Sequence, residues 1–211
     1  DQLRALWAVW EARKASDDER GRASALALQF LTLTLQRGEE VSSLVWSEVN
    51  ESRKLWILPE DRKKERRAAA VPLSEPALLI LAEARELYPD GVGPFTGRGG
   101  EGTIKRNSLT QSFGRDRERL GITNLLPHDL RRTGRTAITN SEGIAMPKHV
   151  GELVLNHATG SRLERTYDIN DYLPEKRRAL EAWGHEVMRI VSCEEMAAST
   201  SGQAVSLEVG Q

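Results

Sequence analysis

Hydrophobic side chains recur every three or four positions along most of the chain, which is the spacing of amphipathic helices. Residues 19–36 are apolar almost throughout, which predicts a helix buried on all sides. Residues 2–14 also predict a helix, with its large apolar side chains on one face: Leu3, Leu6, Trp7 and Trp10. The chain is therefore expected to be mainly helical.

Boundary residues predict further helices downstream. Ser74 and Pro76 are typical of a helix start, and residues 91–103 are rich in glycine, which indicates a loop. The expected helices begin near Glu39 and Pro76, run over 104–120, begin again at Pro127 and Pro147, and end with an amphipathic helix over 174–192.

Two segments change the pattern and predict strands. Leu55–Leu58 is a short apolar run, and residues 68–73 form a second one after a run of seven charged residues (DRKKERR). Two strands with such a connection predict a hairpin with a basic tip. The fold class is thus mainly α with a small antiparallel β-sheet, an α+β arrangement.

The composition fits a folded, water-soluble chain with room for one domain. Of its 211 residues, 39% are hydrophobic and 29% charged. No apolar run suits a membrane span, and the single cysteine, Cys193, allows neither an internal disulfide nor a multi-cysteine zinc site. We expect a reducing, cytoplasmic location.

The organisation expected from the sequence is one domain over residues 1–192, followed by a polar, flexible tail over 193–211. The chain starts at Asp1 without an initiator methionine or signal peptide pattern, so we expect it to be a piece of a longer protein.

The net charge of −1 hides an uneven distribution. Residues 60–135 hold 15 Lys/Arg against 11 Asp/Glu, and residues 136–211 hold 7 against 11. Phosphate binding depends on local positive charge, so the overall balance does not exclude a nucleic-acid partner.

His128 and Arg131 are three residues apart in a predicted helix, which places both side chains on one face. Together they could donate hydrogen bonds to one phosphate, although an ordinary charged surface helix has the same spacing. Arg37 ends the apolar helix, where it must reach solvent or an anion. Glu40 could hold it in place, or the two could form an ordinary surface ion pair that contributes little. Asp129 fits a helix start without any catalytic role.

Three further residues complete the candidate set. Lys64 lies at the basic hairpin tip, where a lysine could donate a proton to a bound backbone or simply be solvated. His157 precedes Tyr167 by ten residues. A tyrosine is a weak nucleophile because its unperturbed pKa is about 10, and nearby cations would lower it. Tyr167 and Tyr172 could equally be packing residues.

Taken in order, these segments resemble the tyrosine recombinase family, especially integrases of phages and genomic islands. The resemblance runs from about Ser24 to Val187. It implies that residues 1–192 form the catalytic domain and that upstream DNA-binding domains are missing from this piece. Thr34-Leu35-Gln36 precedes Arg37, where the family more often has Thr-Gly and an apolar residue. The matching segments are QRGEEVSSLVWSEV (36–49), AVPLS (70–74), HDLRRT (128–133) and LVLNHATGSRLERTY (153–167).

The resemblance implies roles for six residues. Arg37 would be the first catalytic arginine, Lys64 the hairpin lysine, His128 and Arg131 the second motif, His157 the third-motif histidine, and Tyr167 the nucleophile. Lys64 is chosen by counting back from Val71-Pro72-Leu73, and the adjacent Lys63 stays an alternative.

The implied reaction is site-specific recombination through a 3′-phosphotyrosyl intermediate, with no metal and no cofactor. The implied partner is double-stranded DNA, bound by a homotetramer, while the isolated domain could be a monomer; no membrane partner is expected. Two alternatives stay open: relaxation of supercoils as by a type IB topoisomerase, and a DNA-binding protein that does not cut.

Overall fold

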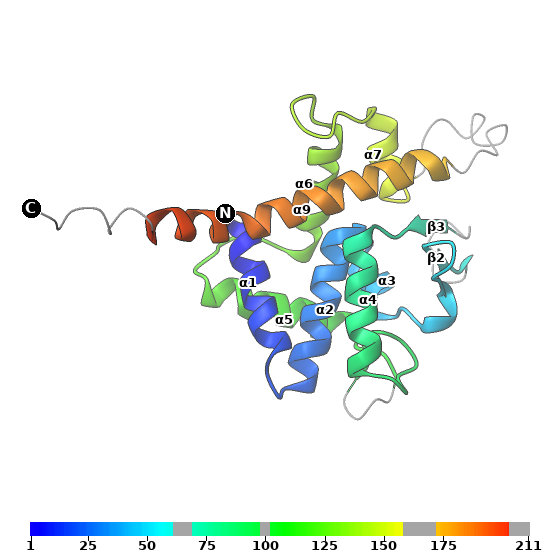
Figure 1. The fold of residues 1–211 in the computed structure, drawn as a ribbon. Helices are drawn as coiled ribbons and strands as arrows, with labels where there is room; N and C mark the ends of the chain where they lie inside the picture. The colour runs from blue at the N-terminus through cyan, green and yellow to red at the C-terminus, as the bar shows by residue number, and fades with distance from the viewer. Residues whose placement is uncertain (61–68, 98–101, 158–171, 203–211) are drawn as a thin grey trace, which may run out of the picture.

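The structure is a computed structural model that describes residues 1–60, 69–97, 102–157 and 172–202, with the backbone alone for 193–202. Most of the described residues are helical, as expected (Figure 1). The helices are α1 (Gln2–Lys14), α2 (Glu19–Thr34), α3 (Gly38–Ser42), α4 (Glu75–Leu87), α5 (Arg106–Arg119), α6 (Pro127–Thr139), α7 (Lys148–Val154) and α9 (Leu173–Gly202).

The small sheet is antiparallel, with strand order β1-β2-β3. The predicted hairpin strands are β2 (Leu55–Leu58) and β3 (Ala69–Pro72), and Trp56 pairs with Val71. The sequence pattern missed β1 (Val49–Asn50), because two residues carry no periodicity. The expected fold class, mainly α with a small antiparallel sheet, is confirmed.

Helix α2 is the centre of the core, as its apolar sequence predicted. Its residues from Ala23 to Thr34 are all buried, and it contacts α1, α4, α5, α6 and α9. Two of the buried hydroxyls are paired locally, since Thr32 and Thr34 donate to carbonyl oxygens four residues earlier. The indole of Trp183 donates to the Thr32 carbonyl oxygen at 2.7 Å.

Helix α9 crosses the molecule between α6 and α7 on one side and α1, α2 and α4 on the other (Figure 1). Its apolar residues Leu180, Trp183 and Val187 are buried against the same chain. In this structure the helix therefore packs in cis.

The expected last helix, over 174–192, is longer in the structure, because α9 continues to Gly202. Residues 194–198 (EEMAA) are good helix formers, and no glycine or proline interrupts the segment before Gly202. The small polar residues that suggested a tail cost only a few tenths of a kcal/mol each in a helix, which is too little to end it.

Helices α2 and α6 meet closely at one pair of residues. Leu35 is buried in the left-handed region at φ 57°, and its side chain fills the space above Gly134 of α6. A methyl group added at Gly134 would overlap the Leu35 side chain. This packing sets the distance between the end of α2 and the face of α6.

We expect Gly134→Ala to destabilise the protein by about 1–3 kcal/mol through overpacking, despite the better helix propensity of alanine. Leu35→Ala should cost about 2–5 kcal/mol through the cavity that it leaves. Urea unfolding of the double variant should show a smaller loss than the sum, because the smaller side chain makes room for the added methyl. Strictly additive losses would contradict direct packing of these two residues.

Candidate active site

Arg37 lies in the tight connection between α2 and α3. Leu35 ends α2 in the left-handed conformation, so the chain turns without the glycine that this turn favours. The next residue, Gln36, is fully buried, and Arg37 then precedes the first turn of α3 with its side chain 45% exposed. The turn thus directs the guanidinium out of the core.

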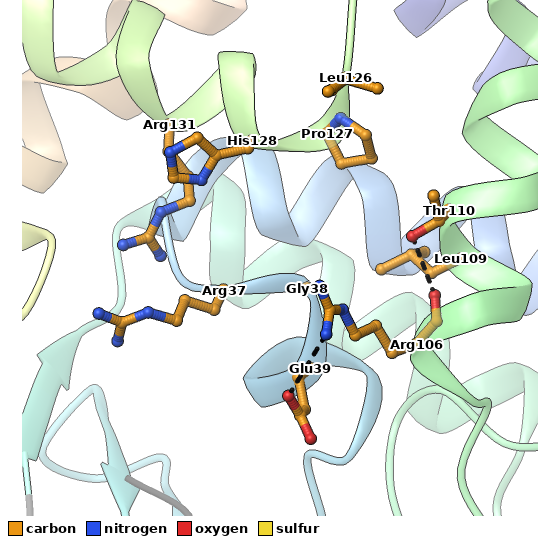
Figure 2. A pocket seen from close by; sticks show the side chains of 10 residues that line it. All are labelled: Arg37, Gly38, Glu39, Arg106, Leu109, Thr110, Leu126, Pro127, His128 and Arg131. Carbon is orange, nitrogen blue, oxygen red and sulfur yellow. Dashed lines mark hydrogen bonds and ion pairs between the residues drawn. The ribbon is translucent and has the colours of Figure 1, made fainter. Parts of the chain in front are cut away.

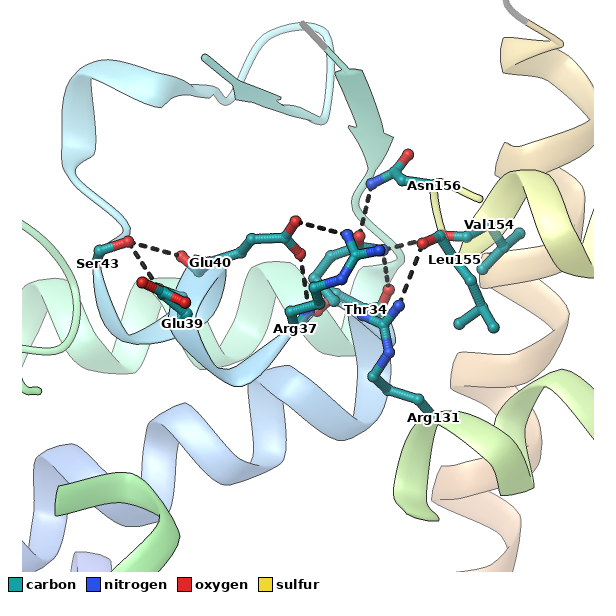
Figure 3. A network of polar contacts seen from close by, with 10 residues as sticks. Thr34, Arg37, Glu39, Glu40, Ser43, Arg131, Val154, Leu155 and Asn156 are labelled. Carbon is teal, nitrogen blue, oxygen red and sulfur yellow. Dashed lines mark hydrogen bonds and ion pairs between the residues drawn. The ribbon is translucent and has the colours of Figure 1, made fainter. Parts of the chain in front are cut away.

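Glu40 holds Arg37 from the first turn of α3. Its buried carboxylate accepts the Arg37 backbone N–H at 2.8 Å and the Arg37 Nη1 at 3.1 Å. This double contact fixes both the backbone and the side chain of Arg37, so the expected pairing of these two residues is confirmed (Figure 3).

Helix α6 carries the second group of candidate residues. Pro127 opens the helix, and Asp129 accepts the Leu126 backbone N–H at 2.9 Å, so Asp129 acts as a residue of the helix start. His128 and Arg131 follow on one face, with His128 exposed and Arg131 only 2% exposed.

A pocket of about 340 Å³ lies between α3, α5 and the start of α6. Figure 2 shows Arg37, His128 and Arg131 gathered on one side of it, with Arg106 on the other. The complete lining is Arg37, Gly38, Glu39, Arg106, Leu109, Thr110, Leu126, Pro127, His128 and Arg131. The structure therefore brings three of the six candidate residues to one cationic pocket.

Arg131 is a buried cation that is incompletely paired. Its Nη2 donates to the Leu155 carbonyl oxygen at 3.1 Å, but within the described parts of the chain Nε and Nη1 have no hydrogen-bond partner. Burial lowers the pKa of Arg131 to about 10, with a further contribution from the positive charge of Arg37, while Glu40 opposes the shift. Such a group favours the approach of an anion.

The pKa of His128 lies below its ordinary value. Partial desolvation is the main cause, the positive charge of Arg131 comes next, and Asp129 opposes both. The imidazole is therefore mainly neutral near pH 7, with one ring nitrogen able to accept a proton.

His157 follows α7 and lies beside the pocket rather than in its lining. Asn156 donates to the Oε1 of Gln36 at 2.7 Å, and the Gln36 amide donates to the Thr34 and Val154 carbonyl oxygens (Figure 3). Buried hydrogen bonds thus connect the segment before Arg37 to the segment before His157. The charge of His157 also reaches His128, which places the two imidazoles in one electrostatic neighbourhood.

Lys64, the alternative Lys63 and Tyr167 lie outside the described residues. Within the described ranges, no group of three or more His, Cys, Asp or Glu could hold a metal ion. In those same ranges no helix is long and apolar enough to cross a membrane.

Sequence reasoning missed several residues that shape this site. Gln36 and Asn156 are 120 positions apart, and no local pattern links them. Arg135 could have been found, because it follows Arg131 by one helical turn and so shares its face. Glu152 gives a weaker signal, five residues before His157.

The model of the phage integrase family matches residues 1–172. Prophage integrase IntA of Escherichia coli (strain K12) is 31% identical over 158 residues, which cover 72% of this chain and 35% of the relative. The chain thus spans about a third of the length of this curated relative.

Two solved structures share the fold at low sequence identity. A lambda integrase tetramer bound to a Holliday junction matches with TM-score 0.56 and 15% identity, over 73% of this chain and 45% of that one. The XerA recombinase matches with TM-score 0.59 and 15% identity, over 92% of this chain and 62% of that one.

Proposed function

Because the chain belongs to the phage integrase family, we propose that it cuts and rejoins DNA as the catalytic domain of a site-specific tyrosine recombinase. The observation that carries this proposal is the pocket in which Arg37, His128 and the incompletely paired Arg131 meet. A DNA phosphate is the anion that suits two guanidinium groups and an imidazole.

In the proposed reaction, the Tyr167 oxygen attacks the phosphorus of one DNA phosphodiester. The new bond is a 3′-phosphotyrosyl link, and the bond from phosphorus to the 5′-oxygen breaks. A 5′-hydroxyl of another strand reverses the step, so no external energy source is needed. Arg37 and Arg131 stabilise the negative charge that grows on the non-bridging oxygens.

Two proton transfers accompany the cleavage step. The neutral state of His128 supports a role in accepting the tyrosine proton, since its lowered pKa leaves a ring nitrogen free. Lys64 is proposed to protonate the departing 5′-oxygen, and His157 to donate a hydrogen bond to the phosphate. Removal of the Lys64 amine should therefore matter less for a substrate with a better leaving group.

The proposed partner is double-stranded DNA, bound by several copies of the protein. The similarity in fold to a lambda integrase tetramer on a Holliday junction supports this assembly. A tetramer brings two DNA duplexes together, as strand exchange requires. The residues 1–192 are proposed as the catalytic unit of this assembly.

The test is covalent capture from a library of random-sequence duplexes that carry single nicks. A nick near the cut lets the 5′-terminal fragment diffuse away, so the covalent intermediate accumulates. We expect a denaturant-resistant adduct, with nucleotides attached to the peptide that contains Tyr167 in mass spectra after nuclease digestion. Absence of any adduct while the protein binds DNA would contradict the proposal and favour a DNA-binding protein that does not cut.

A further inference from the structure

The carboxylate of Glu152 contacts Arg135 of α6 and His157, which lies shortly after α7. Its Oε2 lies 2.8 Å from Nδ1 of His157, and its Oε1 accepts the Nε–H of Arg135 at 2.6 Å. Arg135 Nη2 also contacts the same Oε1. Arg135 stands one helical turn after Arg131, on the face of α6 that carries the candidate site.

The chemistry of this contact indicates which nitrogen of His157 carries the hydrogen. The pKa of Glu152 is lowered, chiefly because His157 donates a hydrogen bond to it, with Arg135 adding to the effect and desolvation opposing it. An ionised carboxylate only accepts hydrogen bonds, so the Nδ1 of His157 must carry the hydrogen. The other ring nitrogen, Nε2, is then the one left for a ligand.

A backbone hydrogen bond also ties His157 to Glu152. The His157 N–H donates to the Glu152 carbonyl oxygen at 3.0 Å. Asn156, immediately before it, is held in the left-handed conformation at φ 54° and is bonded to Gln36. With its backbone and its Nδ1 both fixed by Glu152, the imidazole has little freedom to rotate.

We propose that Glu152 is a positioning residue, anchored by Arg135, that orients the His157 ring and keeps its proton on Nδ1. The ring then presents Nε2 to the DNA phosphate, and Nε2 donates the hydrogen bond in the imidazolium form, in which both ring nitrogens carry a hydrogen. That Nε2 faces a DNA phosphate rests on the proposed function. The orientation of the His157 ring and the position of its hydrogen do not. Carboxylates that bond the second nitrogen of a functional histidine have this effect in many metal and catalytic sites.

An isolated ion pair between α6 and α7 is the competing explanation. Exposed Arg–Glu pairs contribute little and orient nothing beyond themselves. Glu186 and Arg189 on α9 form such a pair at 2.7 Å, and the Glu186 side chain is 33% exposed against 30% for Glu152. Glu186→Ala is therefore the matched control for Glu152→Ala.

The first experiment needs no DNA. Long-range ¹H–¹⁵N correlation spectra of the labelled chain report which nitrogen of a neutral histidine carries the hydrogen, and His157→Phe assigns the signal. We expect the Nδ1–H form of His157 in the wild type and in Glu186→Ala, and a change towards the Nε2–H form in Glu152→Ala. A His157 in the Nε2–H form in the wild type, or one unchanged by Glu152→Ala, would overturn the proposal.

The second experiment measures the rate of covalent adduct formation on the captured DNA site. Glu152→Ala should slow it about 10–100-fold, the range seen when support for a functional histidine is removed. Glu152→Gln should recover part of the rate, since its amide oxygen still accepts the Nδ1–H. In the His157→Phe background, Glu152→Ala should have no further effect, whereas independent, additive losses would mean that Glu152 only joins the two helices.

The two experiments separate the two proposals. If the wild type forms no adduct, the proposed function fails, and the spectra still decide whether Glu152 holds His157. If adducts form normally in Glu152→Ala, the proposed function stands and the positioning role is wrong.

Discussion

Arg131→Met should slow DNA cleavage by about 10²–10³-fold and at the same time make the DNA-free protein more stable. The guanidinium is buried, and among the described residues its Nε and Nη1 have no hydrogen-bond partner. Its pKa of about 10 corresponds to a cost of roughly 3 kcal/mol for holding the charge in this place. Methionine has a similar length and carries no charge.

The expected gain in stability is smaller than that cost. The Leu155 carbonyl oxygen loses the hydrogen bond from Nη2, which costs about 1 kcal/mol. Replacing a buried ion by an apolar side chain of similar volume is often neutral or stabilising by about 1–4 kcal/mol. We therefore expect the free energy of unfolding to rise by about 1–2 kcal/mol in urea titrations at neutral pH.

The rate of DNA cleavage should fall, although the free energy of unfolding rises. Removing one donor to the developing charge typically costs about 10²–10³ in rate, and Arg131 faces the pocket beside Arg37. Inorganic phosphate should raise the Tm of the wild type through binding to the folded state, and it should raise that of Arg131→Met much less.

Arg132→Met is the matched control for this prediction. Arg132 is the next residue on α6, and its side chain is 76% exposed in an ion pair with Asp129. An exposed pair contributes at most about 1 kcal/mol, so neither stability nor cleavage should change much. An Arg131→Met variant that is markedly less stable, or one that cleaves at the normal rate, would remove Arg131 from the proposed role.

The sequence predicted those features that depend on neighbours along the chain. The face of α1 with Leu6 and Trp10 and the buried helix α2 follow from periodicity alone. The pairing of Arg37 with Glu40 spans three residues, and His128 and Arg131 share a face for the same reason. Local spacing was enough for these parts of the site.

The parts that the sequence did not predict depend on contacts between distant segments. Gln36 looked like a departure from the family pattern, yet its amide bonds the chain next to His157 across about 120 residues. Leu35 occupies a backbone conformation that usually favours glycine, because its side chain is needed over Gly134. Contacts formed only in the folded chain decide such positions, so periodicity and motif spacing do not reveal them.

Tyr167→Phe should eliminate the covalent adduct while leaving DNA binding intact. The substitution removes one hydroxyl oxygen, the atom that must form the bond to phosphorus. Loss of the nucleophile in covalent catalysis lowers the rate by roughly 10⁶, which puts adduct formation below detection. Affinity for the captured DNA should stay within about twofold, because Arg37, His128 and Arg131 still provide the electrostatic contacts with phosphate.

Tyr172→Phe is the control for this substitution, five residues away. The ring of Tyr172 lies 6.2 Å from that of His149, and its backbone carbonyl oxygen accepts the Lys176 N–H at the start of α9. We expect Tyr172→Phe to form the adduct at close to the normal rate. Loss of the adduct in Tyr172→Phe with retention in Tyr167→Phe would assign the nucleophile to Tyr172. Retention in both variants would show that neither tyrosine attacks DNA, and the assignment of the nucleophile would then be wrong even if the arginine pocket binds phosphate as proposed.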